Sequence, residues 1–302
     1  MMPRVFLTAI APILTVAGVG YLLARLRLVE DPRPLSRIAT YALLPALALS
    51  TLARSELRGA DILAIAICAW LVAALQSLVG WALCRGLAFD PLTTSAFLLS
   101  VVTVNAGSYG IPLNQFAFGA DTVGMATVYY VATLLVTYGG AVLVGVPTAK
   151  EFRAVGGKLL RTPIFYAACA GLALRQSRVV VPDEMWRPVT LLAAGAVPVM
   201  LTLLGIELAR TNFGGQRAAL SGVFAVRLIV APLVALAVAW GMGFEGSVRN
   251  VAILQSSMPT AIGAALVAVE FNVRPAFVSG AILVTTLGSA VTLTILLLLL
   301  GG

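Results

Sequence analysis

The chain alternates long apolar runs with short loops that carry most of its charged residues. Each run is about 20 residues or longer, the length of an α-helix that crosses the hydrocarbon core of a bilayer. The pattern predicts an all-α polytopic membrane protein with ten transmembrane helices. Their expected bounds are 4–24, 35–53, 60–84, 92–119, 122–147, 162–181, 187–208, 217–241, 248–271 and 275–300.

A hydrophilic break at 148–161 divides the ten expected helices into five and five. An odd number of spans in each half makes the second half enter the membrane from the opposite face, so the halves are expected to form an inverted repeat. Weak internal similarity supports this, because Pro45 in helix 2 and Pro198 in helix 7 are separated by about half the chain. We expect a first repeat at 1–147, a cytoplasmic linker at 148–161 and a second repeat at 162–302.

Two of the ten segments contain residues that break helices. The stretch Asn-Ala-Gly-Ser-Tyr-Gly-Ile-Pro at 105–112 interrupts helix 4, and Gln-Ser-Ser-Met-Pro-Thr-Ala-Ile-Gly at 255–263 interrupts helix 9. Proline removes a backbone donor, and glycine adopts non-helical geometry easily. In hydrocarbon the freed backbone groups must be satisfied, so a broken helix normally lines a cavity. Broken helices at matching positions of two halves predict the binding site of a transporter.

The composition agrees with a membrane protein and excludes several function classes. The chain is 60% hydrophobic and 11% charged, with a mean hydropathy of +1.02, outside the range of soluble domains. We interpret the first apolar run as a transmembrane span, since it is too long for a signal peptide and lacks a convincing cleavage site. The chain has no histidine, and its three cysteines lack CxxC spacing, so we expect no metal and no cofactor.

The net charge of +8 indicates a topology rather than a nucleic-acid partner, because the basic residues are spread over short loops. Twelve of the twenty lie in the loops after helices 1, 3, 5, 7 and 9, and seven lie on the other face. The positive-inside rule then places these loops in the cytoplasm and both termini on the outer side of the membrane. The remaining basic residue, Arg227, lies inside helix 8.

An ionisable side chain at the depth of Arg227 costs at least about 2.5 kcal/mol on insertion scales and usually faces the protein interior with a partner. No buried acid is an obvious partner for it in the sequence. Two interpretations stay open. Arg227 contributes to the binding of an anionic substrate, or it caps backbone carbonyls of a broken helix.

Several motifs resemble those of the auxin efflux carrier family, which includes plant carriers and bacterial permeases for small organic acids. The segment from Asn250 to Pro259 and that from Val269 to Pro275 resemble the end of the family's members. The stretch 105–113 resembles its Asn-rich Gly-Ile-Pro-Leu motif, and 227–232 resembles its helix 8 motif. The chain lacks the long central loop of many plant members, so a bacterial permease is the nearer comparison.

The resemblance implies a ten-helix, 5+5 inverted-repeat transporter with the bile-acid-symporter-like architecture, in which the broken helices 4 and 9 cross at their breaks. It also leaves a homodimer open, because dimers occur in the family. If the breaks cross, two half-helix N-termini with partial positive charge converge on one point, where an anion is stabilised.

We therefore expect a secondary transporter that moves a small organic anion, a mono- or dicarboxylate, through the lipid bilayer by alternating access. The carboxylate would rest against backbone N–H groups at 110–113 and 260–263, and Pro112 and Pro259 would keep the breaks open. The expected substrate-binding residues are Asn105, Ser108, Gly110, Ile111, Pro112, Arg227, Gln255, Ser256, Pro259 and Thr260.

Coupling and function class leave alternatives. No acid lies inside either break, which favours a uniporter or coupling through carbonyl ligands alone. A sodium- or proton-coupled symporter of another solute stays open, with Glu207 as the candidate coupling residue. The other interpretation of Glu207 is a partner for Arg210. A channel and an intramembrane enzyme are the rival classes. We expect no enzyme, because the chain contains no HExxH or GxSxG motif and no paired intramembrane aspartates.

Overall fold

A computed structural model describes residues 5–145, 162–177, 179–211 and 217–301 of the chain. The predicted linker at 148–161 lies outside these residues. The regular secondary structure of the described part is helical apart from one isolated β-bridge, as the apolar pattern predicts. Its elements are η1 (Phe6–Ile10), α2 (Ala11–Arg25), α3 (Arg33–Ile38), η2 (Ala39–Leu43), α4 (Leu44–Ala53), α5 (Gly59–Gly86), α6 (Pro91–Val102), η3 (Ala106–Gly110), α7 (Ile111–Phe118), η4 (Ala120–Thr122), α8 (Val123–Gly145), α10 (Pro163–Ser177), α11 (Asp183–Arg210), α12 (Arg217–Ala225), η5 (Val226–Val230), α13 (Ala231–Gly241), α14 (Gly246–Ser256), α15 (Gly263–Glu270) and α16 (Pro275–Leu300).

Seven helices among the described residues are long and apolar enough to cross a membrane. They extend over Phe6–Arg25, Arg33–Ala53, Gly59–Gly86, Ala120–Thr137, Asp183–Arg210, Arg217–Gly241 and Pro275–Leu300. The chain is thus a multi-pass membrane protein. The two segments predicted to be broken are each divided into shorter helices, and α10 has 15 residues, so the count of ten spans and their inverted repeat stay predictions.

In the described part of the chain, four helices contain a π-helical turn shortly before a proline. The turns η1, η2, η3 and η5 each end two residues before a proline, at Pro12, Pro45, Pro112 and Pro232 respectively. The residue between each turn and its proline donates its N–H to the carbonyl five residues earlier. Proline has no N–H and its ring crowds the carbonyl four residues before it, so the widened turn lets the helix continue past the proline.

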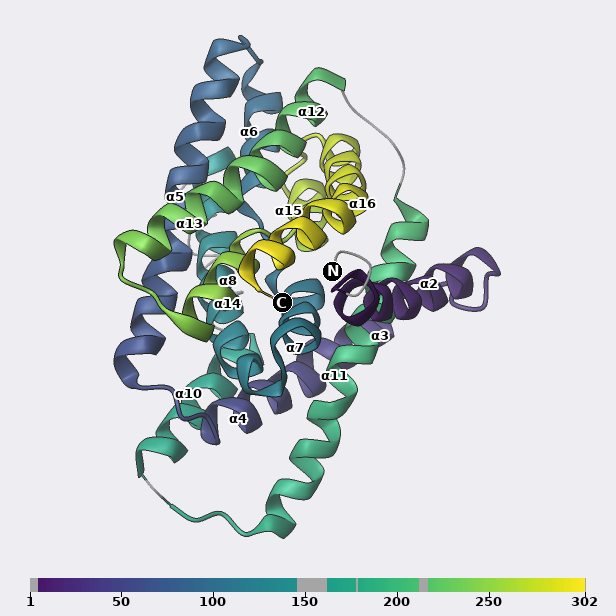
Figure 1. Cartoon of the computed structure of the whole chain (residues 1–302). Helices are drawn as coiled ribbons and strands as arrows, with labels where there is room; N and C mark the ends of the chain where they lie inside the picture. Colours follow the sequence, from purple (N-terminus) through teal and green to yellow (C-terminus); the bar gives the residue numbers. More distant parts are fainter. Residues whose placement is uncertain (1–4, 146–161, 178, 212–216, 302) are drawn as a thin grey trace.

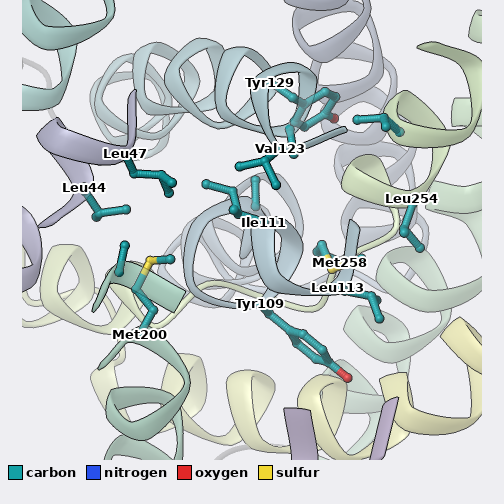
Figure 2. Close-up of a cluster of buried hydrophobic side chains, with 14 of the residues drawn as sticks. Leu44, Leu47, Tyr109, Ile111, Leu113, Val123, Tyr129, Met200, Leu254 and Met258 are labelled. Atoms are coloured by element: carbon teal, nitrogen blue, oxygen red, sulfur yellow. The ribbon is translucent and has the colours of Figure 1, made fainter. Parts of the chain in front are cut away.

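The helices form two groups that pack against each other. The first group, called here the α11 group, contains α2, α3, α4, α10 and α11, and the second, the α14 group, contains α5 to α8 and α12 to α16. Figure 1 shows α2, α3 and α11 along one side and α5, α12 and α13 along the other. Leu44, Leu47 and Met200 of the first group meet Ile111 and Val123 of the second in a buried apolar cluster (Figure 2).

Glycines let α2 and α11 approach until their backbones touch. A Cβ at Gly205 would lie 1.7 Å from the carbonyl oxygen of Ala17, and one at Gly20 would lie 2.0 Å from that of Thr202. Small residues at such crossings are typical of membrane helix pairs. Arg210 then joins the end of α11 to the loop after α2, because its guanidinium donates to the carbonyls of Val29 (3.1 Å) and Glu30.

Gly20→Ala should destabilise the protein, since the new methyl group cannot fit against the backbone of α11. We expect a melting temperature about 3–10 °C lower in detergent, the effect of overpacking a close contact. Gly18→Ala is the matched control on the same helix, because a Cβ there would meet nothing within 4 Å. Equal melting temperatures for the two variants would contradict the crossing described here.

A polar contact joins the start of α6 to the loop between α15 and α16. The Asp90 carboxylate accepts hydrogen bonds from the backbone N–H of Thr93 (3.1 Å) and its hydroxyl (2.5 Å), and caps α6. Arg274 forms a salt bridge with it at 3.0 Å. The hydrogen bonds from Thr93 and the guanidinium of Arg274 lower the pKa of Asp90 to about 2.

The stabilisation from the ionised Asp90 should be lost only in strong acid. Its pKa in the folded protein lies below its ordinary value of 3.8, so the contribution is complete above 3.8 and disappears as the pH falls towards 2. We expect the difference in melting temperature between wild type and Asp90→Asn to shrink across this window. Glu245→Gln is the control, because Glu245 precedes α14 without a side-chain cap. A difference independent of pH would contradict this assignment.

Candidate functional site

The first break lies where α6 ends and η3 begins. The backbone leaves the helix at Thr103, which has extended dihedral angles (φ −82°, ψ 98°), and turns back into helical geometry after Asn105. The second break covers residues 257–262, between α14 and α15. Both predicted interruptions are therefore present, although the first break begins two residues before the predicted stretch.

The two breaks are joined by backbone hydrogen bonds. Val104 and Thr260 form an antiparallel β-bridge, in which the Asn105 N–H donates to the Pro259 carbonyl (2.9 Å) and the Ala261 N–H donates to the Thr103 carbonyl (2.8 Å). Two backbone groups of each interruption are thus satisfied by the other interruption. This is how a broken helix is tolerated at membrane depth.

The donors at the start of the second half of helix 4 lie earlier than the sequence predicts. The N–H of Gly110 donates to the Asn105 carbonyl (3.0 Å), and the N–H of Ile111 donates to the Ala106 carbonyl. The prediction that the free N–H groups begin at 110–113 is therefore wrong. The π-turn before Pro112 extends the half-helix back to Ala106, so Gly110 and Ile111 already use their N–H groups within it. The N–H groups at its start are those of 106–109.

The second break uses part of its expected donors internally. The N–H of Thr260 donates to the Thr285 hydroxyl (3.1 Å), and that of Ala261 belongs to the bridge. The Thr260 hydroxyl donates to the Ser100 carbonyl at 2.8 Å. Within the expected range 260–263, the N–H groups that follow are those of Ile262 and Gly263 at the start of α15.

The amides of Asn105 and Gln255 are buried and only partly satisfied. The Ser108 hydroxyl donates to Asn105 Oδ1 (2.7 Å), and Gln255 Nε2 donates to the Ala126 carbonyl (3.1 Å). Asn105 Nδ2 and Gln255 Oε1 have no hydrogen-bond partner among the described residues. Buried polar groups without partners are rare in proteins. Two residues expected from the sequence thus provide one unpaired donor, Asn105 Nδ2, and one unpaired acceptor, Gln255 Oε1.

Close packing holds the Gln255 carboxamide over η3. Gln255 Oε1 lies 2.0 Å from the position that a Cβ of Gly110 would take, so a larger residue there would have to displace the carboxamide. Ser256 is held by a hydrogen bond of 2.7 Å between its hydroxyl and that of Tyr129. Ile111 and Pro112 are buried, and Ile111 belongs to the apolar cluster of Figure 2, which makes them packing residues of the site.

Arg227 projects from η5 and is 1% exposed. Its guanidinium donates to the backbone carbonyls of Val101 (2.9 Å), Ser256 (2.7 Å) and Met258 (2.8 Å). It also donates to Gln76 Oε1. These contacts match the second interpretation, in which Arg227 caps the carbonyls of broken helices. The sequence could not identify the acceptors, since they come from three different spans.

Glu207 is not brought to the breaks. It lies in the last turns of α11, next to Arg210, and its carbonyl accepts the Thr211 hydroxyl at 2.8 Å. Met200, which reaches the cluster beside η3, is about 10 Å away along the helix axis at 1.5 Å per residue. The interpretation as a partner for Arg210 fits this position, and a coupling role stays a prediction.

A cavity of about 360 Å³ lies between the two groups of helices. Its walls come from α4 and α11 on one side and from α7, η4 and α8 on the other. Four of the lining residues are polar but uncharged: Ser50, Thr51, Gln115 and Thr190. Sequence reasoning missed them, because single hydroxyl and amide side chains are common in apolar spans. Gln115, which directly follows the Gly-Ile-Pro-Leu-Asn stretch, was the available signal.

Comparison with known proteins identifies the kind of protein that carries these breaks. A family model described as "Membrane transport protein" matches residues 5–152 and 148–297, which is nearly the whole chain. The chain belongs to this family of membrane transporters. The match bears out the resemblance stated from the motifs at 105–113 and 250–259.

The similar proteins of known name are also transporters or carriers. It is 26% identical over 297 residues to an uncharacterized transporter of Methanothermobacter thermautotrophicus, and the alignment covers 93% of this chain and 94% of the relative. It is 28% identical to auxin efflux carrier component 1 of Arabidopsis thaliana and 30% identical to component 3a of Oryza sativa. Both plant alignments cover 42% of this chain and 21% of the carrier.

The fit of Gln255 over Gly110 can be tested by coupling two substitutions. Gly110→Ala should lower the melting temperature of the transporter, because the methyl group displaces the carboxamide from its bond to Ala126. The same substitution should cost clearly less in a Gln255→Ala background, where the obstructing atoms are gone. Equal costs in both backgrounds would mean that the two residues do not touch.

Proposed function

We propose that this transporter is a carrier for a small organic anion with at least one carboxylate, a mono- or dicarboxylate, and that the two joined breaks form its binding site. The observation that carries the proposal is the buried, unpartnered Asn105 Nδ2 beside the start of a half-helix. An amide donor next to free backbone N–H groups and a positive helix end suits a carboxylate.

The roles of the proposed site residues follow from their contacts. The carboxylate accepts hydrogen bonds from Asn105 Nδ2 and from the N–H groups of 106–109, which include that of Ser108, while the field of Arg227 acts from behind the breaks. The hydroxyls of Ser256 and Thr260 already bond to Tyr129 and Ser100, so we assign them to holding the breaks together. Pro259 lies within the second break, and we assign it to keeping that break open. Pro112 lies in the half-helix that follows the first break, so the expectation that it keeps that break open is wrong.

Gln255 adds a requirement on the substrate. Its Nε2 is fixed by the Ala126 carbonyl, which leaves Oε1 as an unpaired acceptor against Gly110 of η3. An acceptor repels a bare carboxylate but binds a hydroxyl or N–H group. We therefore infer that the substrate carries such a donor near its carboxylate, as a hydroxy acid does. The plant relatives are named for auxin, and indole-3-acetate, which has a ring N–H, belongs among the acids to be tested.

Transport would proceed by alternating access. We assign the five spans before the linker at 148–161 and the five after it to an inverted repeat of ten spans. Seven of these ten spans are the continuous helices described above. The other three are formed by α6 with α7, by α10, and by α14 with α15. The cavity of about 360 Å³ between the two groups of helices has the size of a small-molecule site, and rocking of the α14 group against the α11 group would open it to alternate sides. We further propose that both termini lie outside, because most basic residues lie in the loops after helices 1, 3, 5, 7 and 9. The resemblance to bacterial permeases supports a bacterial inner membrane.

A thermal-shift screen tests this function. We expect purified protein to melt at a higher temperature with one class of carboxylate, because a ligand that binds only the native state stabilises it by mass action. Paired acids that differ in one donor, such as malate and succinate, test the role of Gln255. The acid with the hydroxyl group should give the larger shift.

Asn105→Ala should weaken the binding of both acids by about tenfold or more, the value of a hydrogen bond to a charged group. Gln255→Ala should instead abolish the difference between the two acids. Asn250→Ala is the control, since Asn250 lies on α14 but bonds to the Leu300 carbonyl away from the breaks. If Asn105→Ala and Gln255→Ala both show the same ligand-induced rise in melting temperature as wild type, the breaks do not form the binding site.

A further inference from the structure

The C-termini of two helices of the α14 group lie close together, at the joined breaks. Both α6 and α14 run into their breaks, ending at Val102 and Ser256. The last carbonyls of a helix lack intrahelical partners and carry partial negative charge. In the interior of a membrane protein this charge must be balanced by protein, solvent or an ion.

The balance is provided here by one side chain. Arg227 donates to carbonyls from both ends, those of Val101 at 2.9 Å and Ser256 at 2.7 Å, and to the Met258 carbonyl of the second break at 2.8 Å. Its fourth acceptor is the Gln76 amide oxygen. All four oxygens belong to uncharged groups, and the salt bridges in the described part of the chain lie elsewhere.

This set of oxygens has the character of a cation site. In transporters with broken helices, unwound backbone carbonyls and half-helix C-termini coordinate the coupling sodium ion or proton. In this chain the guanidinium of Arg227 lies among carbonyls of this kind. The cavity beside it, lined by Gln76, Tyr129 and Ser256 among others, has about 10 Å³ for the centre of a water molecule, which is room for about one water.

We propose that Arg227 is a built-in cation, which joins the two helix C-termini and assembles the breaks without a coupling ion. The side chain replaces the sodium ion that a symporter of this kind would bind, so the bridged breaks are stable in the absence of sodium. This inference deepens the proposed carrier function. Its conclusion about ion coupling rests on the protein being a carrier. Its test concerns the ligand-free protein, so the outcome is independent of any carboxylate.

The test compares melting temperatures in sodium, potassium and choline chloride at equal ionic strength, with and without low-millimolar guanidinium chloride. Wild type should melt at the same temperature in all of them. Arg227→Ala should melt about 5–10 °C lower in choline, because several buried acceptors lose their donor. Added guanidinium or sodium should restore at least half of this loss by binding the vacated oxygens.

Two other variants separate a built-in cation from a merely structural side chain. Arg227→Lys keeps the positive charge and should respond to no cation. Arg249→Ala removes an exposed arginine from the far end of α14 and should behave as wild type. A sodium-specific stabilisation of wild type, or an Arg227→Ala protein whose stability no cation restores, would overturn the proposal.

If Arg227→Ala yields no folded protein, Arg227→Gln and Arg227→Lys decide the question. The lysine variant should be recovered folded in choline, and the glutamine variant only when guanidinium is present during purification. Equal recovery of both in choline would overturn the proposal. Rescue by a cation without any carboxylate response would instead support Arg227 as a built-in cation and count against the carboxylate carrier.

Discussion

The hydrogen-bonded contact between the two breaks is the interaction on which the structure of this transporter depends. Each break frees backbone groups that hydrocarbon cannot satisfy, and the bridge between Val104 and Thr260 pairs two groups of each break with each other. Neither interrupted segment is tolerable alone at that depth. The surrounding contacts of Arg227, Tyr129 and Thr285 serve the same end, because each of them satisfies a group in or beside a break.

The polarity of the half-helices gives the bridge two chemically different sides. The carbonyl ends of α6 and α14 are closed by a single guanidinium from η5. The N–H end at the start of η3 adjoins the buried Asn105 Nδ2, which has no partner among the described residues. One side is thus neutralised from within the protein, and the other is suited to an anion from outside it. This asymmetry is the physical reason to expect an anion carrier.

Much of this arrangement could be predicted from the sequence, because breaks and spans are written in local residue types. The glycines and prolines at 105–112 and 255–263 indicated both breaks, and the apolar runs indicated a multi-pass helical protein. The register of the half-helix was missed, since the π-turn before Pro112 moves the first free N–H back to Ala106. A sequence pattern does not distinguish an α-turn from a π-turn.

Contacts between distant spans could not be predicted in the same way. Arg227 was recognisable as a buried cation, but its acceptors lie on α5, on α6 and at the end of α14 and in the break that follows it, and their meeting depends on packing. The cavity between the two groups was missed for the same reason. Its polar residues, such as Ser50 and Gln115, come from separate helices and have no shared spacing along the chain.

The most direct test of the central claim is an experimental structure of the protein with the carboxylate that stabilises it most. The account predicts the carboxylate beside the bridge, within hydrogen-bond distance of Asn105 Nδ2 and of N–H groups at the start of η3, with Arg227 still bound to its carbonyls. A carboxylate bound away from the bridge, or paired directly with a released Arg227, would contradict it.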